Sequence, residues 1–329
     1  MDHWDLYHGD IPPHISEAAK APAMLRLRQV GMNCGCEYTA FPLFKGLAPY
    51  SRFDHSLGVA LIVWHFTEDI RQSLSALFHD ISTPVFAHVV DFLQGDHLKQ
   101  EATEGKTGEL IAGSAEISAL LGKLDLKPCD VEDYHRFPIA DNNSPALSAD
   151  RLEYTLGNAV NYGLCSKKEA GNIYADLYVG QNEVGVPELA FRTYESGCRF
   201  GNLALSCGRI YVSNEDRYAM EKLAGILKDA IAKGYLSAES LYSSEPAVIE
   251  QLLHSPAADA WTQFRSCSQI LLHSEPAEGR LQVFAKKRYI DPLINGKRLS
   301  SLSADFYKEV TDFLNEPQDQ WLSAVKTSG

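Results

Sequence analysis

Length, composition and charge describe a folded, acidic protein. The chain has 329 residues, of which 45% are hydrophobic and 22% charged, and this hydrophobic content excludes an intrinsically disordered chain. Lys and Arg number 30 and Asp and Glu 43, which gives a formal net charge of −13. Because proteins that bind nucleic acid through its phosphates usually present a basic face, we expect no nucleic-acid partner.

The sequence carries no signal for a membrane either. No apolar run reaches the roughly 18 residues that a membrane span needs, and residues 1–5 (MDHWD) lack the features of a signal peptide. The seven cysteines are odd in number and scattered, which is typical of free thiols in a reducing compartment. We therefore expect a cytoplasmic protein with no membrane partner.

Hydrophobic periodicity and capping residues predict a mainly helical first half. Helices are expected over residues 24–30, 57–70, 74–79 and 84–93, and from a cap at Ser148 to about residue 160. The helix from 84 is expected because, in Ser82-Thr83-Pro84, a capping residue precedes a proline at the first helical position.

The second half mixes helices with short β segments. Residues 177–189 predict a hairpin, and helices are expected over 214–231, after 245 and over 304–314. Residues 281–294 favour β structure, and Asn295-Gly296 is a strong two-residue hairpin turn. The expected fold is all-α with small β-hairpins in the middle and near the C-terminus. We expect a helical core over 1–165 and a helical extension with small β elements over 166–329, packed on that core.

Four residues at predicted helix ends stand out as metal-ligand candidates. They are His55, the adjacent pair His79 and Asp80, and Asp150. Imidazole and carboxylate together suit a borderline divalent cation. Neighbouring side chains on a helix diverge by about 100°, so His79 and Asp80 can share one ion only where the helix ends. The alternative is that these histidines simply pack at the edge of the core.

Four motifs occur in the order found in the HD-domain phosphohydrolase superfamily. They are RFDHSLGV at 52–59, ALFHD at 76–80, PVFAH at 84–88 and DRLEY at 150–154. The chain resembles this superfamily over about residues 20–165, and is most similar to the branch of the dGTP triphosphohydrolases and the sterile-alpha-motif/HD dNTP triphosphohydrolase. The resemblance implies a helical HD-domain bundle and one divalent ion per chain (Mn, Fe, Ni, Co, Zn or Mg), bound by His55, His79, Asp80 and Asp150. Proteins of this branch often self-associate, so a homo-oligomer is a further implication.

The resemblance also implies catalytic and substrate-binding residues. His88 matches a histidine that acts as general acid toward the phosphoester oxygen, and Asp91 matches the acid that orients it. Two residues three apart on one helix can touch, although a surface His–Asp pair is the alternative. Arg52 matches a phosphate-contacting arginine, Arg151 a basic residue at the site, and Tyr154 an aromatic near the nucleoside. Core packing is the alternative for Tyr154.

Several positions depart from the triphosphohydrolase pattern. Residues 81–83 (IST) replace a segment in which a histidine is expected, and Asn158 stands where a sugar-contacting Asp is expected. Gln100 replaces the histidine of a His-Glu pair, so Glu101 alone remains as a third catalytic candidate, and His97 is a candidate substitute one turn earlier. With the metal set intact, these departures predict the same type of chemistry on an altered substrate.

The resulting hypothesis is a metal-dependent phosphohydrolase that acts on a nucleotide or related small phosphoester through a metal-activated water. One alternative is a non-catalytic HD protein that binds metal and nucleotide, which the altered substrate residues would also fit. Another is a two-metal HD oxygenase or phosphodiesterase. That class needs two further histidines before the final Asp, and His88, His97 and His135 do not have the usual spacing.

Overall fold

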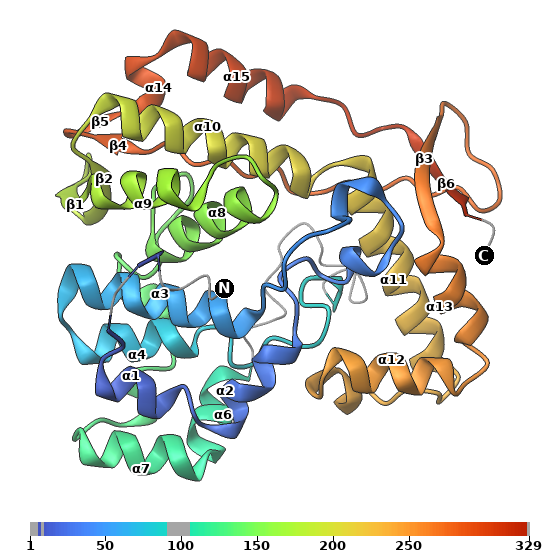
Figure 1. Ribbon diagram of the computed structural model, residues 1–329, viewed down its shortest axis with the longest axis horizontal. Helices are drawn as coiled ribbons and strands as arrows, with labels where there is room; N and C mark the ends of the chain where they lie inside the picture. The colour runs from blue at the N-terminus through green and yellow to red at the C-terminus, as the bar shows by residue number, and fades with distance from the viewer. Residues whose placement is uncertain (1–5, 8–9, 91–105, 328–329) are drawn as a thin grey trace.

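The computed structural model describes residues 6–7, 10–90 and 106–327, which form a mainly helical molecule with small sheets (Figure 1). Its first elements are α1 (Pro13–Ala18), α2 (Pro22–Arg26), α3 (Arg52–Thr67) and α4 (Ile70–Phe78), with 3-10 helices at Leu27–Gln29, Cys36–Tyr38 and Pro42–Phe44. Ser51 and Asp54 form a capping box at the start of α3, and Asp69 caps α4. These caps satisfy backbone N–H groups that have no partner within the helix.

The middle of the chain supplies the helix that carries the DRLEY motif. Its elements are α6 (Thr107–Gly113), α7 (Ala115–Lys123), α8 (Ala149–Asn161) and α9 (Lys167–Ala175), with 3-10 helices at Pro128–Asp130 and Tyr134–Arg136. The Ser148 hydroxyl accepts the backbone N–H of Arg151, which confirms the predicted cap. Gly163 beyond the helix has a φ of 70°, a conformation that glycine adopts without strain.

The second half alternates helices with short strands. Its elements are β1 (Leu177–Gln181), β2 (Pro187–Phe191), α10 (Tyr194–Tyr211), α11 (Asn214–Ala232), the 3-10 helix Glu239–Tyr242, α12 (Glu245–Leu253), α13 (Ala258–Arg265), β3 (Cys267–His273), β4 (Leu293–Ile294), β5 (Lys297–Arg298), α14 (Leu299–Leu302), α15 (Ala304–Asn315) and β6 (Trp321–Lys326). One sheet has the order β1-β2-β4-β5, and β3 pairs with β6 in a second.

Both predicted hairpins are confirmed, as is the mainly helical fold class. Strands β1 and β2 are antiparallel neighbours, and β4 and β5 pair around the Asn295-Gly296 turn. Asn295 and Gly296 have φ angles of 48° and 79°, as a two-residue hairpin turn of the favoured twist requires.

The prediction of one helix over 57–70 is wrong. Helix α3 ends at Thr67, because Glu68 adopts a left-handed conformation with a φ of 50°, and Asp69 then caps α4. The apolar periodicity continues across this break, since both helices pack on the same core, and periodicity alone therefore hid it.

The prediction of a helix starting at Pro84 is also wrong. Phe86 and Ala87 have φ angles of 58° and 43°, so the segment 84–88 forms turns, and helical structure begins only at Val89. A proline that follows a Ser-Thr pair is equally compatible with a turn. The remainder of the predicted helix, from 91 on, lies outside the described residues.

Residues 281–294 are less regular than predicted. Only Leu293–Ile294 forms a strand, and Leu281 makes an isolated bridge to Leu322. The antiparallel pair β3–β6 was not predicted, because its partners lie about 50 residues apart and no short turn joins them.

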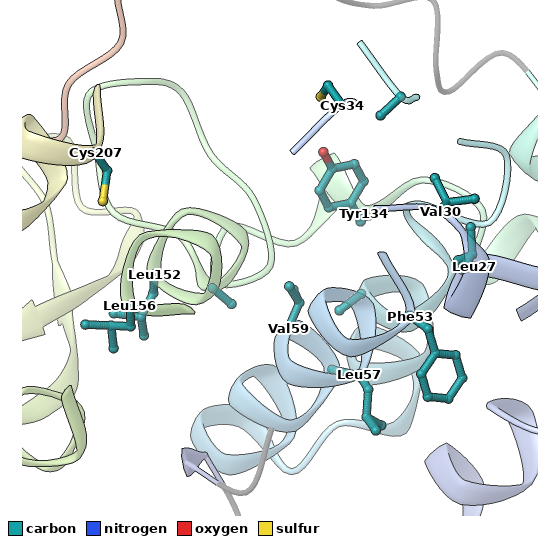
Figure 2. Packing of buried hydrophobic residues seen from close by; sticks show 14 of the residues in the cluster. Leu27, Val30, Cys34, Phe53, Leu57, Val59, Tyr134, Leu152, Leu156 and Cys207 are labelled. Carbon is teal, nitrogen blue, oxygen red and sulfur yellow. The ribbon is translucent and has the colours of Figure 1, made fainter. Parts of the chain in front are cut away.

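The helices stack in layers that place α3 at the centre of the first half. In Figure 1, α15, α10, α8 with α9, α3 with α4, and α1 follow one another across the left of the molecule, and neighbouring layers are in contact. Figure 2 shows Val59 of α3 and Leu152 and Leu156 of α8 among the buried side chains, with Cys207 of α10 pointing toward α8. Because α3 packs against both α4 and α8, the ends of these three helices are held together.

The hydrophobic core does not stop at the predicted boundary near residue 165. One buried cluster includes Leu61 and Leu156 from the first part and Phe200 and Phe313 from the second. The division into 1–165 and 166–329 remains a prediction. Among the described residues, no helix is both long and apolar enough to cross a membrane.

Candidate metal centre

Three helix ends bring the four predicted metal ligands together. His55 lies in the first turn of α3, one turn after the Ser51 cap. His79 and Asp80 follow the last residue of α4, where the backbone leaves the helix in turns. Asp150 is the second residue of α8. Since α3 contacts both α4 and α8, the side chains of all four residues converge on one point.

The distances between the polar atoms are short enough for one cation. The Nε2 atoms of His55 and His79 lie 3.2 Å apart. Asp150 Oδ1 lies 3.0 Å from His55 Nε2 and 3.7 Å from His79 Nε2. Asp80 Oδ2 lies 3.8 Å and 3.5 Å from the same two nitrogens. One donor atom each from His55, His79 and Asp80 fall within 4.8 Å of one another.

Both histidines have an acceptor on the nitrogen that faces away from this point. His79 Nδ1 lies 2.7 Å from the backbone oxygen of Ala76, and His55 Nδ1 lies 2.5 Å from Glu153 Oε2. An acceptor at Nδ1 places the proton there and leaves the Nε2 lone pair for a metal, as is usual for metal-binding histidines. The donor set therefore fits a divalent cation.

Glu153 is a buried carboxylate beside the metal ligands to which the sequence analysis assigned no role. Its side chain is fully buried, and its Oε2 accepts both from His55 and from the Tyr50 hydroxyl at 2.5 Å. Gly58 makes room for it, because a Cβ there would lie 2.7 Å from Glu153 Cγ. The spacing signal was present: Glu153 follows Asp150 by three residues, which places both on one face of α8.

Arg52 belongs to the same cluster. Its Nη1 donates to Asp80 Oδ2 at 3.1 Å, and both side chains are 10% exposed. The Thr83 hydroxyl donates to Asp80 Oδ1 at 2.6 Å. Asp80 is thus held by a guanidinium on one oxygen and a hydroxyl on the other, in a charge-assisted network that fixes its orientation.

The protonation of the cluster follows from these contacts. Burial opposes ionisation of Asp80, but Arg52 and the two histidines outweigh it and hold the pKa of that carboxyl well below its usual range. Burial likewise opposes ionisation of Asp150, but the hydrogen bond to His55 and the charge of that ring lower its pKa to about 2. Burial disfavours a charged His55, yet Glu153 and Asp150 raise its pKa to about 10. The carboxylates are therefore ionised, and a metal must displace a proton from His55, so metal affinity rises with pH.

Arg151 is held by the loop that precedes α8. Its guanidinium donates to Asn142 Oδ1 at 2.8 Å and to the Ser148 hydroxyl at 3.0 Å, and it pairs with Asp141 at 3.2 Å. Asp141 in turn pairs with His135 Nδ1 at 2.7 Å. These partners of Arg151 lie in 141–148, a loop that packs next to Asp150.

Of the other predicted residues, the structure describes Tyr154 and His88. Tyr154 is half-buried beside Tyr211, with ring centroids 6.3 Å apart, and burial with the nearby Asp150 carboxylate raises its pKa to about 12. His88 is half-buried and follows the left-handed pair Phe86 and Ala87. Asp91 and Glu101, and the candidate substitute His97, lie outside the described residues.

Comparison with known proteins finds relatives, one of which is named for a metal-dependent activity. The chain is 25% identical over 246 residues to the uncharacterised protein YdhJ of Bacillus subtilis, which covers 74% of each chain. It is 28% identical over 139 residues to the metal-dependent phosphohydrolase cns2 of Cordyceps militaris, covering 41% of this chain and 39% of that protein. It is also 28% identical over 161 residues to the uncharacterised protein YwfO of Bacillus subtilis, covering 42% of this chain and 34% of that protein. None of the family models compared with the chain matches it.

Proposed function

We propose that this protein is a metal-dependent phosphohydrolase whose substrate is a small phosphoester, with a nucleotide as the substrate class. The observation that carries the proposal is the convergence of His55, His79, Asp80 and Asp150, with both imidazoles turned to present Nε2. The similarity to the phosphohydrolase of Cordyceps militaris supports it. One divalent cation per chain, bound by these four residues, is part of the proposal.

A bound divalent cation supplies Lewis acidity, which lowers the pKa of water and polarises phosphoryl oxygens. The chain's own groups add to this. Arg52 places a positive charge beside Asp80, where it can balance charge on the phosphoryl oxygens in the transition state. Glu153 and the Ala76 carbonyl hold the two imidazoles in one orientation, so the site needs little rearrangement during the reaction.

Proton transfer completes the proposed hydrolysis. Water forms a bond to phosphorus as the bond to the leaving oxygen breaks, and the water releases a proton to solvent. His88, oriented by Asp91, gives the leaving oxygen a proton, with Glu101 as a further acid. These three roles, and the nucleoside contact of Tyr154, rest on the resemblance. For Arg151 we propose a positioning role, because its contacts hold the loop 141–148 against α8.

The test combines metal analysis with a hydrolysis panel on the full chain. Nucleoside mono-, di- and triphosphates, deoxynucleoside triphosphates and p-nitrophenyl phosphate are assayed with Mn, Co, Ni, Fe, Zn or Mg. We expect about one metal per chain and turnover of at least one substrate. Asp80→Ala should lose both, whereas Asp259→Ala, at an exposed position on α13, should keep both.

Two results would overturn the proposal. A wild-type chain that binds metal but turns over no phosphoester with any of these cations is not a phosphohydrolase. Hydrolysis that persists unchanged in a folded Asp80→Ala variant would place the reaction elsewhere.

A further inference from the structure

A second polar cavity lies away from the metal centre, in the second half of the chain. It has a volume of about 280 Å³ and lies between the end of α10, the start of α11 and the segment that follows α15. Three basic side chains line it, those of Arg209, Arg217 and Lys287, and we call it the basic cavity. In a chain with a net charge of −13, three cations around one cavity are unexpected.

The basic cavity has an excess of positive charge. Glu316 is the one acidic residue among those that line it, and it pairs with Arg209. Lys287 Nζ instead donates to the backbone oxygens of Leu314 and Glu316. Burial lowers the pKa of Lys287 and Glu316 raises it, but Arg217 and Arg209 lower it further, because like charges lie close together. An anion in the cavity would relieve this repulsion.

Arg217 is the most buried of the three cations. It is 3% exposed, and its Nη atoms donate to the neutral oxygens of Val283 and Asn214. Its Nε–H has no acceptor among the described residues. Gln318, which also lines the cavity, has a buried Nε2 without a partner in the described part of the chain. Buried donors are nearly always satisfied in folded proteins, so these two leave the wall of the cavity with an excess of donors as well as of positive charge.

The start of α11 adds a favourable field. Ser213 caps this 19-residue helix, and Ser213 and Asn214 line the cavity. The first N–H groups of a helix carry partial positive charge and attract anions. The acidic residues of the first turn are not among the lining residues, and Asp216 accepts from the Cys36 thiol at 3.7 Å.

We propose that the basic cavity binds a phosphate group of a small anion, either inorganic phosphate or pyrophosphate or the terminal phosphates of a nucleotide. Guanidinium groups match the oxygens of phosphate in pairs, and a tetrahedral oxyanion offers enough acceptors for Arg209 and Lys287 together, with the charge of the buried Arg217 behind them. Of the described residues that line the cavity, none is aromatic, so none of them can stack on a base. This site is independent of the metal centre and of the proposed hydrolysis.

Titration calorimetry with pyrophosphate on the full-length chain tests the proposal. The Asp80→Ala background removes binding at the metal centre. We expect one pyrophosphate per chain, with an affinity that falls tenfold or more in Arg209→Gln and in Lys287→Gln, because each loses a charge-assisted contact. Arg280→Gln is the matched control, since Arg280 is also basic and bonds a backbone oxygen, that of Glu275, outside the cavity. Circular dichroism checks that every variant is folded.

Further titrations distinguish the source of the phosphate. Tighter binding of a nucleoside triphosphate than of pyrophosphate supports a nucleotide, and equal affinity supports an inorganic anion. The proposal is overturned if no saturable binding occurs, if Arg209→Gln and Arg280→Gln bind equally well, or if an uncharged nucleoside binds in a Lys287-dependent manner.

Discussion

The metal centre and the basic cavity are both assembled from helix ends, but they carry opposite charge. In the metal centre, Asp80 and Asp150 meet two imidazoles and a guanidinium that lie close enough to pair with them. In the basic cavity, the described lining residues bring three cations to one carboxylate. The difference shows that local charge is decided by which side chains meet, and that a net charge of −13 describes neither region.

The two regions also differ in burial. His55 and Glu153 are almost completely buried, whereas the side chains of Arg209 and Glu316 are 41% and 48% exposed. Buried charges interact strongly and are screened little, and exposed ones are screened by salt. The metal centre should therefore depend on pH, and the basic cavity on ionic strength.

Removing a carboxylate from the metal centre should have the largest effect. In Asp150→Ala we expect the bound metal to fall from about one per chain to near zero, because the site loses a ligand 3.0 Å from His55 Nε2. In the wild type, a cation at a hundredfold excess over its Kd should add about 3 kcal/mol to the free energy of unfolding. Thermal melts with and without Mn²⁺ measure this. Stabilisation that survives in Asp150→Ala, as in the exposed control Asp305→Ala, would contradict the assignment.

The orienting carboxylate should have the next largest effect. Glu153→Gln keeps the size of the side chain but weakens the hydrogen bond to His55 Nδ1, and we expect metal affinity to fall by about 10- to 100-fold. Competition with a chromogenic chelator measures the change. Tyr50→Phe removes the other bond to Glu153 and leaves the carboxylate, so its effect should be smaller. Equal metal affinities in wild type and Glu153→Gln would show that Glu153 only fills space.

Ionic strength should separate the two regions. Raising NaCl from about 0.1 M to about 1 M shortens the Debye length from about 10 Å to about 3 Å. We expect pyrophosphate binding at the basic cavity to weaken severalfold over this range, and metal affinity at the buried centre to change much less. Calorimetry at both salt concentrations provides the comparison. Parallel losses at both sites would mean that the contrast in screening is wrong.

The smallest effect is expected at a third place in the molecule, the neighbouring buried acids Glu37 and Glu245. Burial and the neighbouring Glu245 raise the pKa of Glu37 to about 8, in contrast to the lowered pKa of Asp80. Glu245 itself accepts from Tyr38 and from the Gly31 N–H at 2.8 Å each. A raised pKa means that the folded state retains a proton that the unfolded chain loses near pH 4.5, so stability is greatest below that pH and falls as the pH rises toward about 8.

Glu37→Gln should remove this pH dependence. We expect its melting temperature to exceed that of the wild type by a few degrees at pH 8.5 and to match it near pH 4.5. Thermal melts across this range measure the difference, with Glu17→Gln as the exposed control. A pH-independent difference between Glu37→Gln and wild type would indicate a packing effect.

The sequence by itself determined the helical class, several helix ends and the grouping of four side chains. Ser148 caps a helix and the Asn295-Gly296 turn forms, both as predicted, because caps and tight turns depend on a few neighbouring residues. The convergence of His55, His79, Asp80 and Asp150 could be predicted because each lies within a short motif at a helix end.

Only the tertiary structure decided what surrounds those residues. Glu153 orients His55 because α8 packs on α3 where Gly58 leaves space, and Arg151 is held by the loop 141–148. The turn at Phe86 and Ala87, the β3–β6 pair and the basic cavity depend on contacts between segments far apart in the chain. Local propensity carries no information on such contacts, since their free energy comes from burial and from partners that folding brings together.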